Sequence, residues 1–286
     1  MKRKPDVAIV GPGRLGAVIA RELKDAGYVV AEIVCRSRTQ SIRQARSLAR
    51  RVRARAIEIG SNLSAHVVWI CVPDSEIARV AQLLSQDGEW KGRVVFHSSG
   101  ALPASELKSL RTLGASVAAV HPLMTFVSGS ATKLKDVSFA LEGDRRAVRI
   151  AQTMVHDIGG RGVLIEAKAK AAYHTWGAFA SPLLIALVAT AEQVASQAGV
   201  STAAARRRMR PILVQTLRNY IQVGPQKAFT GPLVRGDVET IRKHLSALKS
   251  LPEALAVYKA LAKSSLKHLP VGNRQDVADA LGVRWK

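Results

Sequence analysis

The sequence predicts an α/β domain with a mostly parallel sheet, followed by an all-helical domain. Two observations lead to this fold class. In the first half, short β-branched runs alternate with amphipathic stretches, which is the pattern of repeated β-α-β units. After about residue 166 the strand-like runs stop, and long Ala/Leu-rich helical stretches follow. We therefore expect one domain over residues 1–165 and a second over residues 166–286.

Each expected strand is a short run of mainly β-branched and apolar residues. The runs are Val7–Val10, Val29–Cys35, Val67–Val72, Val94–His97, Ser116–Val120, Ser138–Glu142 and Gly162–Ile165. The helical stretches between them include Leu15–Ala26, Gln40–Arg50, Ser75–Leu84 and Ala104–Leu110. The second half contains the helical stretches Ala167–Ala198, Thr202–Val223, Asp237–Lys249 and Glu253–His268, with glycine and proline between them.

The composition is that of an ordinary soluble chain, because 48% of the 286 residues are hydrophobic and 22% are charged. The two cysteines, Cys35 and Cys71, both lie in apolar runs, which argues against a disulfide framework and favours a cytoplasmic protein. The apolar run Val7–Val10 is too short for a secretory signal. Thr175–Ala191 has no ionisable side chain, and we expect a buried core helix there and no membrane span.

The formal net charge of +22 raises the possibility of a polyanionic partner. Eight arginines and no acid lie between Arg36 and Arg55, and residues 206–210 form a second basic cluster. Aromatic residues make up only 5%, however, which leaves little material for stacking on bases. We therefore expect a solvated basic surface and no nucleic-acid partner.

The strongest motif is a glycine-rich turn between a strand and a helix. It consists of Gly11, Pro12, Gly13, Arg14, Leu15 and Gly16, directly after the run Val7–Val10. In a G-x-G-x-x-G turn of this kind, the first glycine permits the tight turn and the second lets the backbone approach a pyrophosphate. The third lets helix and strand pack closely. The positive end of the helix then faces the phosphates. The motif predicts that residues 11–16 bind a dinucleotide in a Rossmann domain.

The end of the second strand indicates which dinucleotide is bound. An acid about 20 positions after the glycines would bind the ribose 2′-hydroxyl, whereas arginine accommodates a 2′-phosphate. This sequence has Arg36, Ser37 and Arg38 there, and Glu32 lies too early, inside the strand. A guanidinium suits a phosphate, so we expect NADP(H) in preference to NAD(H). The arginines could instead simply belong to the basic run.

Two further turns follow expected strands at their carboxyl ends, where open α/β sheets bind ligands. One contains Val72, Pro73 and Asp74, and the other contains Ser98, Ser99 and Gly100. We expect the first near the adenosine or pyrophosphate and the second near the nicotinamide ribose. As plain turns, both would look much the same.

Four segments, together with the glycine turn, carry a resemblance to known proteins. They are His97–Gly100, His121–Phe126, Tyr173-His174 and Thr230–Asp237. In their order they resemble Rossmann-like predicted oxidoreductases whose C-terminal part is the domain of unknown function 2520. More distantly, the chain resembles pyrroline-5-carboxylate reductases and 6-phosphogluconate and β-hydroxyacid dehydrogenases. The resemblance implies a nicotinamide cofactor and a C-terminal helical domain of the 6-phosphogluconate dehydrogenase type, which often dimerises.

The same resemblance points to a catalytic pair. In the related hydroxyacid dehydrogenases, a lysine and a polar residue four positions later stand at the start of the long interdomain helix. Here Lys170 and His174 have this spacing, so both project from one helical face. The second residue is histidine where the relatives have asparagine, and Lys168 competes for the role of the lysine. A solvated lysine and a structural histidine are the alternative.

The remaining candidates could bind substrate or join the domains. His121 precedes Pro122, which biases it toward an extended conformation at the edge of the expected cleft, and we count it as a catalytic candidate. Arg235 could clamp a carboxylate, and Thr230 belongs to the same segment of the resemblance. Asp237 is a substrate or interdomain candidate too, although its position favours a helix N-cap. No metal-ligand spacing occurs, so no metal is expected.

Together these features predict an NADP(H)-dependent oxidoreductase that transfers hydride to or from a small polar carbonyl, imine or hydroxy compound. The Ala-rich helix around Trp176–Ala180 predicts a homodimer. The alternative is a non-catalytic dinucleotide-sensing or interaction protein that retains the fold.

Overall fold

The computed structural model of the chain describes residues 4–86, 88–128 and 132–285. It divides into two compact units, Met1–Ala180 and Ser181–Lys286. The last strand ends at Leu164, where the strand pattern was expected to stop, but the first unit also includes the helix that follows it. The domain boundary after residue 165 therefore stays a prediction.

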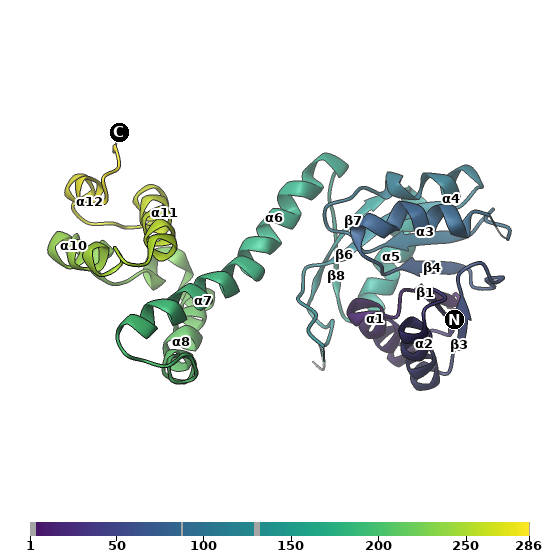
Figure 1. Cartoon of the computed structure of the whole chain (residues 1–286). Coiled ribbons are helices and arrows are strands. Elements are labelled where there is room, and N and C mark those ends of the chain that lie inside the picture. Colours follow the sequence, from purple (N-terminus) through teal and green to yellow (C-terminus); the bar gives the residue numbers. More distant parts are fainter. Residues whose placement is uncertain (1–3, 87, 129–131, 286) are drawn as a thin grey trace. The chain divides into compact units, whose positions relative to one another are not determined.

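The first unit is built on one eight-stranded sheet in the order β3-β2-β1-β4-β5-β6-β7-β8 (Figure 1). The strands are β1 (Val7–Val10), β2 (Val30–Cys35), β3 (Arg55–Glu58), β4 (Val67–Ile70), β5 (Val94–His97), β6 (Ser116–Pro122), β7 (Ser138–Gly143) and β8 (Arg161–Leu164). All neighbouring strands are parallel except β6 and β7, which are antiparallel. The expected mostly parallel sheet is confirmed.

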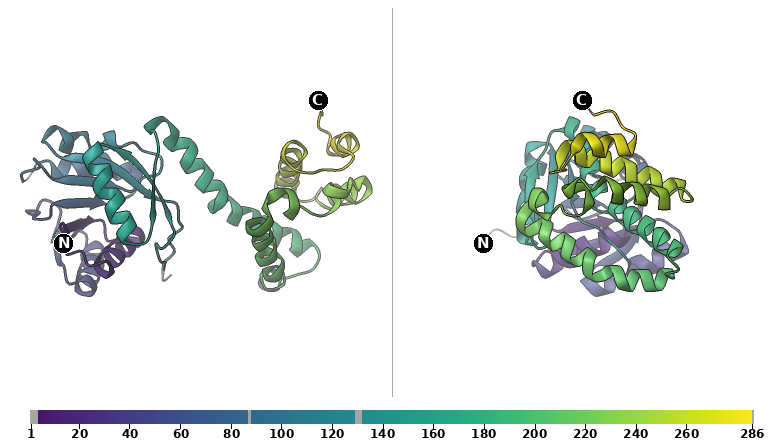
Figure 2. Two further views of the ribbon diagram at one scale, coloured as in Figure 1. Left: turned by 180° about the vertical axis from the view of Figure 1, so that it is seen from behind. Right: turned by 90° about the vertical axis from the view of Figure 1, so that its left-hand side faces the viewer.

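Helices cover both faces of this sheet. They are α1 (Arg14–Asp25), α2 (Thr39–Val52), α3 (Ile77–Leu84), α4 (Lys108–Thr112) and α5 (Arg145–Asp157), with the short 3-10 turns η1 (Asp74–Glu76) and η2 (Ala104–Leu107). The 3-10 turn η3 (Ala167–Ala169) and helix α6 (Lys170–Ala180) follow the last strand. The apolar faces of α1, α2 and α5 share one core, and α3, α4 and η2 share the other. Figure 2 shows α5 lying across the sheet when the molecule is seen from behind.

Coverage of both faces explains why the inner strands read as continuous apolar runs rather than alternating ones. Every residue of β1, β4 and β5 is buried. Trp69 and Phe96 meet edge to face across neighbouring strands, with ring centroids 5.3 Å apart. This core holds the carboxyl ends of the strands in fixed positions.

The strand order creates a crevice beside β1. The chain runs from β1 outward through β2 to β3, and then returns to β4 on the other side of β1. The loops after β1 and β4 therefore leave the sheet in opposite directions. Open α/β sheets bind ligands at such a switch point, outside the carboxyl ends of the strands.

The second unit is entirely helical in the residues described. Its helices are α7 (Pro182–Gln197), α8 (Thr202–Ala228), α9 (Pro232–Arg235), α10 (Val238–Ala247), α11 (Pro252–His268) and α12 (Arg274–Leu281). Ile241, Leu266 and Val277 contribute to its small core. The Asp237 carboxylate accepts a hydrogen bond of 3.0 Å from the Thr240 amide, so the expected N-cap of α10 is confirmed.

One strand was missed, and two expectations about the apolar helical stretch were wrong. Strand β3 was not predicted, because it is an edge strand whose four residues are exposed or half-buried and include Arg55 and Glu58. The helical stretch expected over Ala167–Ala198 is broken at Ser181, whose backbone leaves the helical region before Pro182 begins α7. The stretch Thr175–Ala191 was expected to be a buried core helix, yet no residue of α7 is buried.

The same apolar stretch is long enough to cross a membrane. Among the residues described, the 31-residue helical segment Ala167–Gln197 is the one that is long and apolar enough for a span. Length and composition alone are weak evidence for a membrane span.

Candidate functional site

The glycine turn has the geometry that a phosphate-binding loop needs. Gly11 has φ +99°, and a Cβ there would lie 2.6 Å from the Cys71 carbonyl oxygen, so the turn requires glycine. A Cβ on Gly16 would lie 2.1 Å from the Gly11 oxygen, because helix α1 packs closely on the loop. Gly13, in contrast, has no protein atom within 4 Å of its Cβ position. The loop is therefore packed on one side and open at Gly13.

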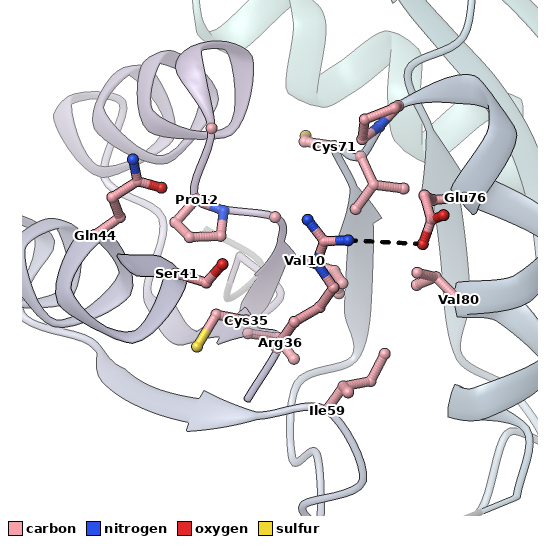
Figure 3. Close-up of a pocket in the computed structure, with 15 residues that line it drawn as sticks. Val10, Pro12, Cys35, Arg36, Ser41, Gln44, Ile59, Cys71, Glu76 and Val80 are labelled. Atoms are coloured by element: carbon pink, nitrogen blue, oxygen red, sulfur yellow. Dashed lines mark ion pairs between the residues drawn. The ribbon is translucent and has the colours of Figure 1, made fainter. Parts of the chain in front are cut away.

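The open side leads into a cavity of about 160 Å³ at the carboxyl edge of the sheet (Figure 3). The predicted cofactor residues that line it are Gly11, Pro12, Gly13, Arg36, Val72 and Pro73. No side chain caps α1, and its first internal hydrogen bond runs from the Ala17 amide to the Gly13 oxygen. The amides before Ala17 consequently have no acceptor within the helix and favour an anion at this end. These features fit a dinucleotide pyrophosphate.

The end of β2 brings arginine to the same cavity. The Arg36 side chain reaches across the cavity, and its Nη1 lies 3.9 Å from the Glu76 carboxylate on the opposite wall (Figure 3). Arg36, Ser37 and Arg38 also line a neighbouring cavity of about 260 Å³. Glu32, by comparison, is fully buried in β2 and accepts hydrogen bonds from Arg55 and Ser64. Glu32, the acid of β2, thus has its partners inside the protein, whereas Arg36 and Arg38 line the cavities.

Hydrogen bonds join the turn after β5 to the turn after β4. The Ser99 hydroxyl donates to Asp74 over 2.7 Å and accepts from the Leu102 amide over 2.9 Å. The Ser98 hydroxyl accepts from the Trp69 indole over 2.8 Å. Both predicted turns are therefore fixed to one another and to the core, which a plain turn would not require. Their roles as cofactor contacts stay predictions.

His97 is the buried anchor of this turn. Its Nδ1 accepts a hydrogen bond from the Ser99 amide over 3.1 Å, so the ring proton is on Nε2, which donates to the Pro103 oxygen over 3.0 Å. The neutral ring satisfies both partners. Burial lowers the pKa of His97 to about 4, although the bond to Pro103 opposes the shift.

His121, on β6, has the opposite tautomer. Its Nδ1 lies 3.0 Å from the Ser98 oxygen, and because a carbonyl only accepts, Nδ1 carries the proton. Among the residues described, Nε2 has no hydrogen-bond partner. Burial lowers the pKa of His121, and the bond to the Ser98 carbonyl partly opposes that shift. Nε2 of His121 is therefore unprotonated and available to accept a proton.

Lys170 begins helix α6 and is fully buried. Its Nζ donates to the Ser99 oxygen over 3.1 Å. Burial lowers the pKa of the ammonium, while the carboxylates of Glu142 and Asp74 act in the opposite direction. Lys170 and His121 therefore lie in one cluster, because they donate hydrogen bonds to neighbouring backbone carbonyls of the turn after β5. Its competitor Lys168 is exposed and pairs with Glu166 at 2.8 Å.

Gly100 provides the space in which the two histidines meet. The rings of His121 and His174 lie edge to face, with centroids 5.6 Å apart. A Cβ on Gly100 would lie 2.5 Å from His174 Cδ2 and 2.7 Å from His121 Nε2. The three predicted catalytic residues Lys170, His174 and His121 are thus brought together around the turn after β5. His174 is exposed, whereas His121 is half-buried.

The remaining predicted residues belong to the second unit. Arg235 is exposed, and its guanidinium lies 4.0 Å from the Asp237 carboxylate that caps α10. Thr230 is exposed between α8 and α9. Their role in substrate binding or interdomain contact stays a prediction. In the described part of the chain, no group of three His, Cys, Asp or Glu could hold a metal ion.

Three residues near the site escaped the sequence reasoning. Glu76 and Arg79 face the arginines at the end of β2, and Glu142 accepts a 2.7 Å hydrogen bond from the Ala104 amide near Lys170. The position of Glu76 and Arg79 just beyond the carboxyl end of β4 was an available signal. Glu142 lies at the end of β7, and no local pattern distinguishes it.

Comparisons with known proteins agree with this geometry. Residues 2–122 match the model of a Rossmann-like domain, and residues 137–265 match the domain of unknown function DUF2520. Among the curated proteins, none matches the chain in sequence.

Solved structures share the fold at low sequence identity. A candidate NADP oxidoreductase from Bacteroides fragilis is 20% identical, with a TM-score of 0.76, covering 91% of this chain and 97% of that one. A protein from Thermotoga maritima is 24% identical, with a TM-score of 0.72, covering 96% and 98%. An imine reductase from Pseudomonas sp. is 17% identical, with a TM-score of 0.60, covering 98% and 100%.

At these identities the solved structures show a shared fold. The two domain matches follow one another along the sequence and agree with the resemblance drawn from the sequence. The N-terminal part of the chain is thus similar to Rossmann-like domains, and the part after it is similar to the domain of unknown function DUF2520.

Proposed function

We propose that this protein is an NADP(H)-dependent oxidoreductase that transfers hydride to or from a small polar carbonyl, imine or hydroxy compound. One observation carries the proposal: the Asp74–Ser99 hydrogen bond joins the turn after β4, part of which lines the glycine-turn cavity, to the turn after β5. His121, Lys170 and His174 gather around that second turn. A dinucleotide site beside titratable groups is the arrangement that hydride transfer requires.

The residues that would hold the cofactor follow from the cavity. The free amides at the start of α1 and the open backbone at Gly13 suit a pyrophosphate. Arg36, Ser37 and Arg38 suit a 2′-phosphate, which supports NADP(H) over NAD(H). When bound, the cofactor supplies or accepts the hydride, and the protein supplies orientation and proton transfer.

The proton would be handled by His121 and His174. Because the Ser98 carbonyl fixes the proton of His121 on Nδ1, its Nε2 is the atom that gains or loses a proton. His174 packs against this ring and is exposed to solvent. In the proposal, His121 exchanges the proton with the heteroatom of the substrate, and His174 binds the substrate or shares the proton.

Lys170 would act on the same centre as a positive charge. Its Nζ contacts the Ser99 carbonyl and is shielded from solvent, so its field is weakly screened by water. In the proposal, Lys170 stabilises negative charge that develops on the heteroatom of a carbonyl substrate and holds the turn in place. The likeness to an imine reductase supports carbonyl and imine compounds as the first substrates to test.

We also propose that the protein is a cytoplasmic homodimer. In the second unit, the helices α7 and α8 expose large apolar side chains, among them Ile185, Ile212 and Ile221 at 67%, 66% and 78%. Exposed apolar surface of this extent is typical of an interface. Light scattering after gel filtration measures the mass. A monomer at micromolar concentration would contradict the dimer.

The function is tested in two steps. First, titration with NADPH and with NADH measures both affinities, and stronger binding of NADH would overturn the choice of cofactor.

Second, the wild type and the double variant Lys170→Ala/His174→Ala are assayed with NADPH on a panel of small ketones, aldehydes and cyclic imines. We expect turnover by the wild type alone, with NADPH binding retained in both. Binding without turnover of any compound would favour the dinucleotide-sensing alternative, and turnover by the double variant would remove Lys170 and His174 from catalysis.

A further inference from the structure

The Glu76 carboxylate lies near two arginines that belong to different elements. Its carboxylate lies 3.1 Å from Arg79 Nη1, one turn further along, and 3.9 Å from Arg36 Nη1, at the end of β2. The first distance is that of a hydrogen-bonded ion pair, whereas the second is too long for a hydrogen bond. The Arg36 side chain is therefore attracted to Glu76 but is not locked onto it.

The cavity around this ion pair has an excess of positive charge. It is lined by the three guanidinium groups of Arg36, Arg38 and Arg79, but only one carboxylate, that of Glu76, which leaves a net charge of +2. The arginine side chains of the two pairs are largely accessible to solvent, with 49% of Arg36 and 66% of Arg79 exposed. Exposed pairs of this kind contribute little stability and exchange partners readily. The excess positive charge of this cavity therefore favours binding of a further anion.

The position of Arg36 relates this cavity to the glycine turn. The side chain crosses the cavity next to Gly11–Gly13, from the β2 side to the wall that carries Glu76 and Val80 (Figure 3). A nucleotide whose pyrophosphate lies on the glycine turn would bring its adenosine ribose to the end of β2. A phosphate on that ribose would then compete with the Glu76 carboxylate for the same guanidinium groups.

We propose that Arg79 is a further ligand of the adenosine 2′-phosphate and that Glu76 is the internal counter-ion which this phosphate replaces. Glu76 then limits the affinity for phosphorylated dinucleotides, because its charge repels the phosphate dianion and must give up its partners. Arg79 raises that affinity by pairing with the phosphate. This inference rests on the proposed function and adds two residues of α3 and its preceding turn to the choice between NADP(H) and NAD(H).

A rival role for Glu76 makes the opposite prediction. A carboxylate near the ribose could accept a hydrogen bond from a free 2′-hydroxyl, which is how many NAD-binding sites select their cofactor. In that case removal of the Glu76 charge would weaken NADH binding. The counter-ion role predicts instead that NADPH binds more strongly and NADH is little affected.

The test measures binding without any turnover. Isothermal titration calorimetry at pH 7.5 gives the dissociation constants of the full-length protein for NADPH, NADH, adenosine 2′,5′-bisphosphate and adenosine 5′-monophosphate. The last two probes differ only in the 2′-phosphate. The variants are Arg79→Gln and Glu76→Gln. Arg43→Gln and Glu239→Gln are the controls, because both side chains are exposed and line neither cavity, and the changes in net charge match.

For Arg79→Gln we expect NADPH and the bisphosphate to bind about tenfold more weakly, as the loss of one charged hydrogen bond predicts. For Glu76→Gln we expect both to bind about threefold more strongly, since one nearby repulsion is removed. NADH and the monophosphate should change less than twofold in either variant, and the controls should resemble the wild type.

The outcomes separate the two proposals. If the wild type binds neither NADPH nor NADH, the proposed function fails. If the wild type prefers NADPH but Arg79→Gln binds it as Arg43→Gln does, only the role of Arg79 fails. If Glu76→Gln loses affinity for NADH, or gains none for the bisphosphate, the counter-ion role of Glu76 is wrong.

Discussion

The carboxyl edge of the sheet carries two regions of opposite construction. At the ends of β2 and β4, the group Arg36–Glu76–Arg79 consists of partly exposed charges whose distances reach 3.9 Å. At the ends of β5 and β6, the turn Ser98–Gly100 donates a hydrogen bond to His97 and accepts hydrogen bonds from His121 and Lys170. The first region can exchange one anion for another, whereas the second fixes tautomers and leaves one nitrogen free. In the proposed function, the exposed ion pairs of the first region recognise the cofactor, and the hydrogen-bonded groups of the second region transfer the proton.

The largest effect that we expect concerns the buried anchor, His97. Its pKa in the folded protein is lowered from 6.5 to about 4, so between these values the unfolded chain binds more protons than the folded one. Stability is therefore lost as the pH falls from 6.5 toward 4, by about 3 kcal/mol in total. Urea unfolding at intervals across this range measures the slope.

The variant His97→Asn isolates this contribution. It should be less stable at pH 7 and should lose much less stability on acidification. His156→Gln is the control, since that side chain is 89% exposed and should keep the wild-type slope. An unchanged slope in His97→Asn would assign the acid sensitivity to other groups.

The second prediction concerns the space at Gly100. In Gly100→Ala the new methyl group would overlap His174 and His121, at 2.5 Å and 2.7 Å, and displace both rings. A displacement of about 1 Å in a catalytic group lowers kcat/KM by about 100-fold. Gly177→Ala is the control, because its methyl group meets only the flexible end of Leu123. Wild-type kcat/KM in Gly100→Ala would show that the histidine pair does not act in the reaction.

A smaller effect should follow from loss of the buried ammonium. In Lys170→Met an unbranched apolar side chain, one atom shorter, replaces the lysine, and the charge and the hydrogen bond to the Ser99 carbonyl are lost. We expect kcat to fall about tenfold, with NADPH affinity unchanged, since one charged hydrogen bond is removed at the chemical centre only. The same assays on Lys168→Met, whose exposed side chain pairs with Glu166, should give wild-type values. A fall of kcat in Lys168→Met with wild-type kcat in Lys170→Met would assign the role to Lys168.

The smallest effect distinguishes the two regions by salt. Raising NaCl from about 0.05 to about 0.5 M shortens the screening length to a few ångströms and weakens exposed pairs more than buried ones. NADPH affinity should therefore fall about threefold more than NADH affinity, because the 2′-phosphate pairs with exposed arginines. Calorimetric titration at several salt concentrations measures both. Equal salt dependence of the two cofactors would place the 2′-phosphate away from Arg36 and Arg79.

Much of the nucleotide region could be predicted from local pattern. The packing of the turn requires Gly11 and Gly16, and Gly13 leaves the turn open to the cavity, as the spacing of the motif predicts. Arg36 could be located by counting to the end of the second strand. The histidine region could be predicted only in part. His121, Lys170 and His174 were candidates, but nothing local indicated that His121 and Lys170 bond carbonyls of one turn or that His174 packs against His121.

The sequence by itself determined the α/β pattern of the first unit, the glycine turn and the cationic end of β2, because each depends on residues close together in the chain. It missed the edge strand β3, whose exposed Arg55 pairs with the buried Glu32 across the sheet. Only the tertiary structure decided that Glu76 and Arg79 face Arg36, that His97 and His121 carry their protons on different nitrogens, and that Lys170 is buried. These properties depend on which strand ends become neighbours, and the order of strands in a sheet is set by long-range packing rather than by local sequence.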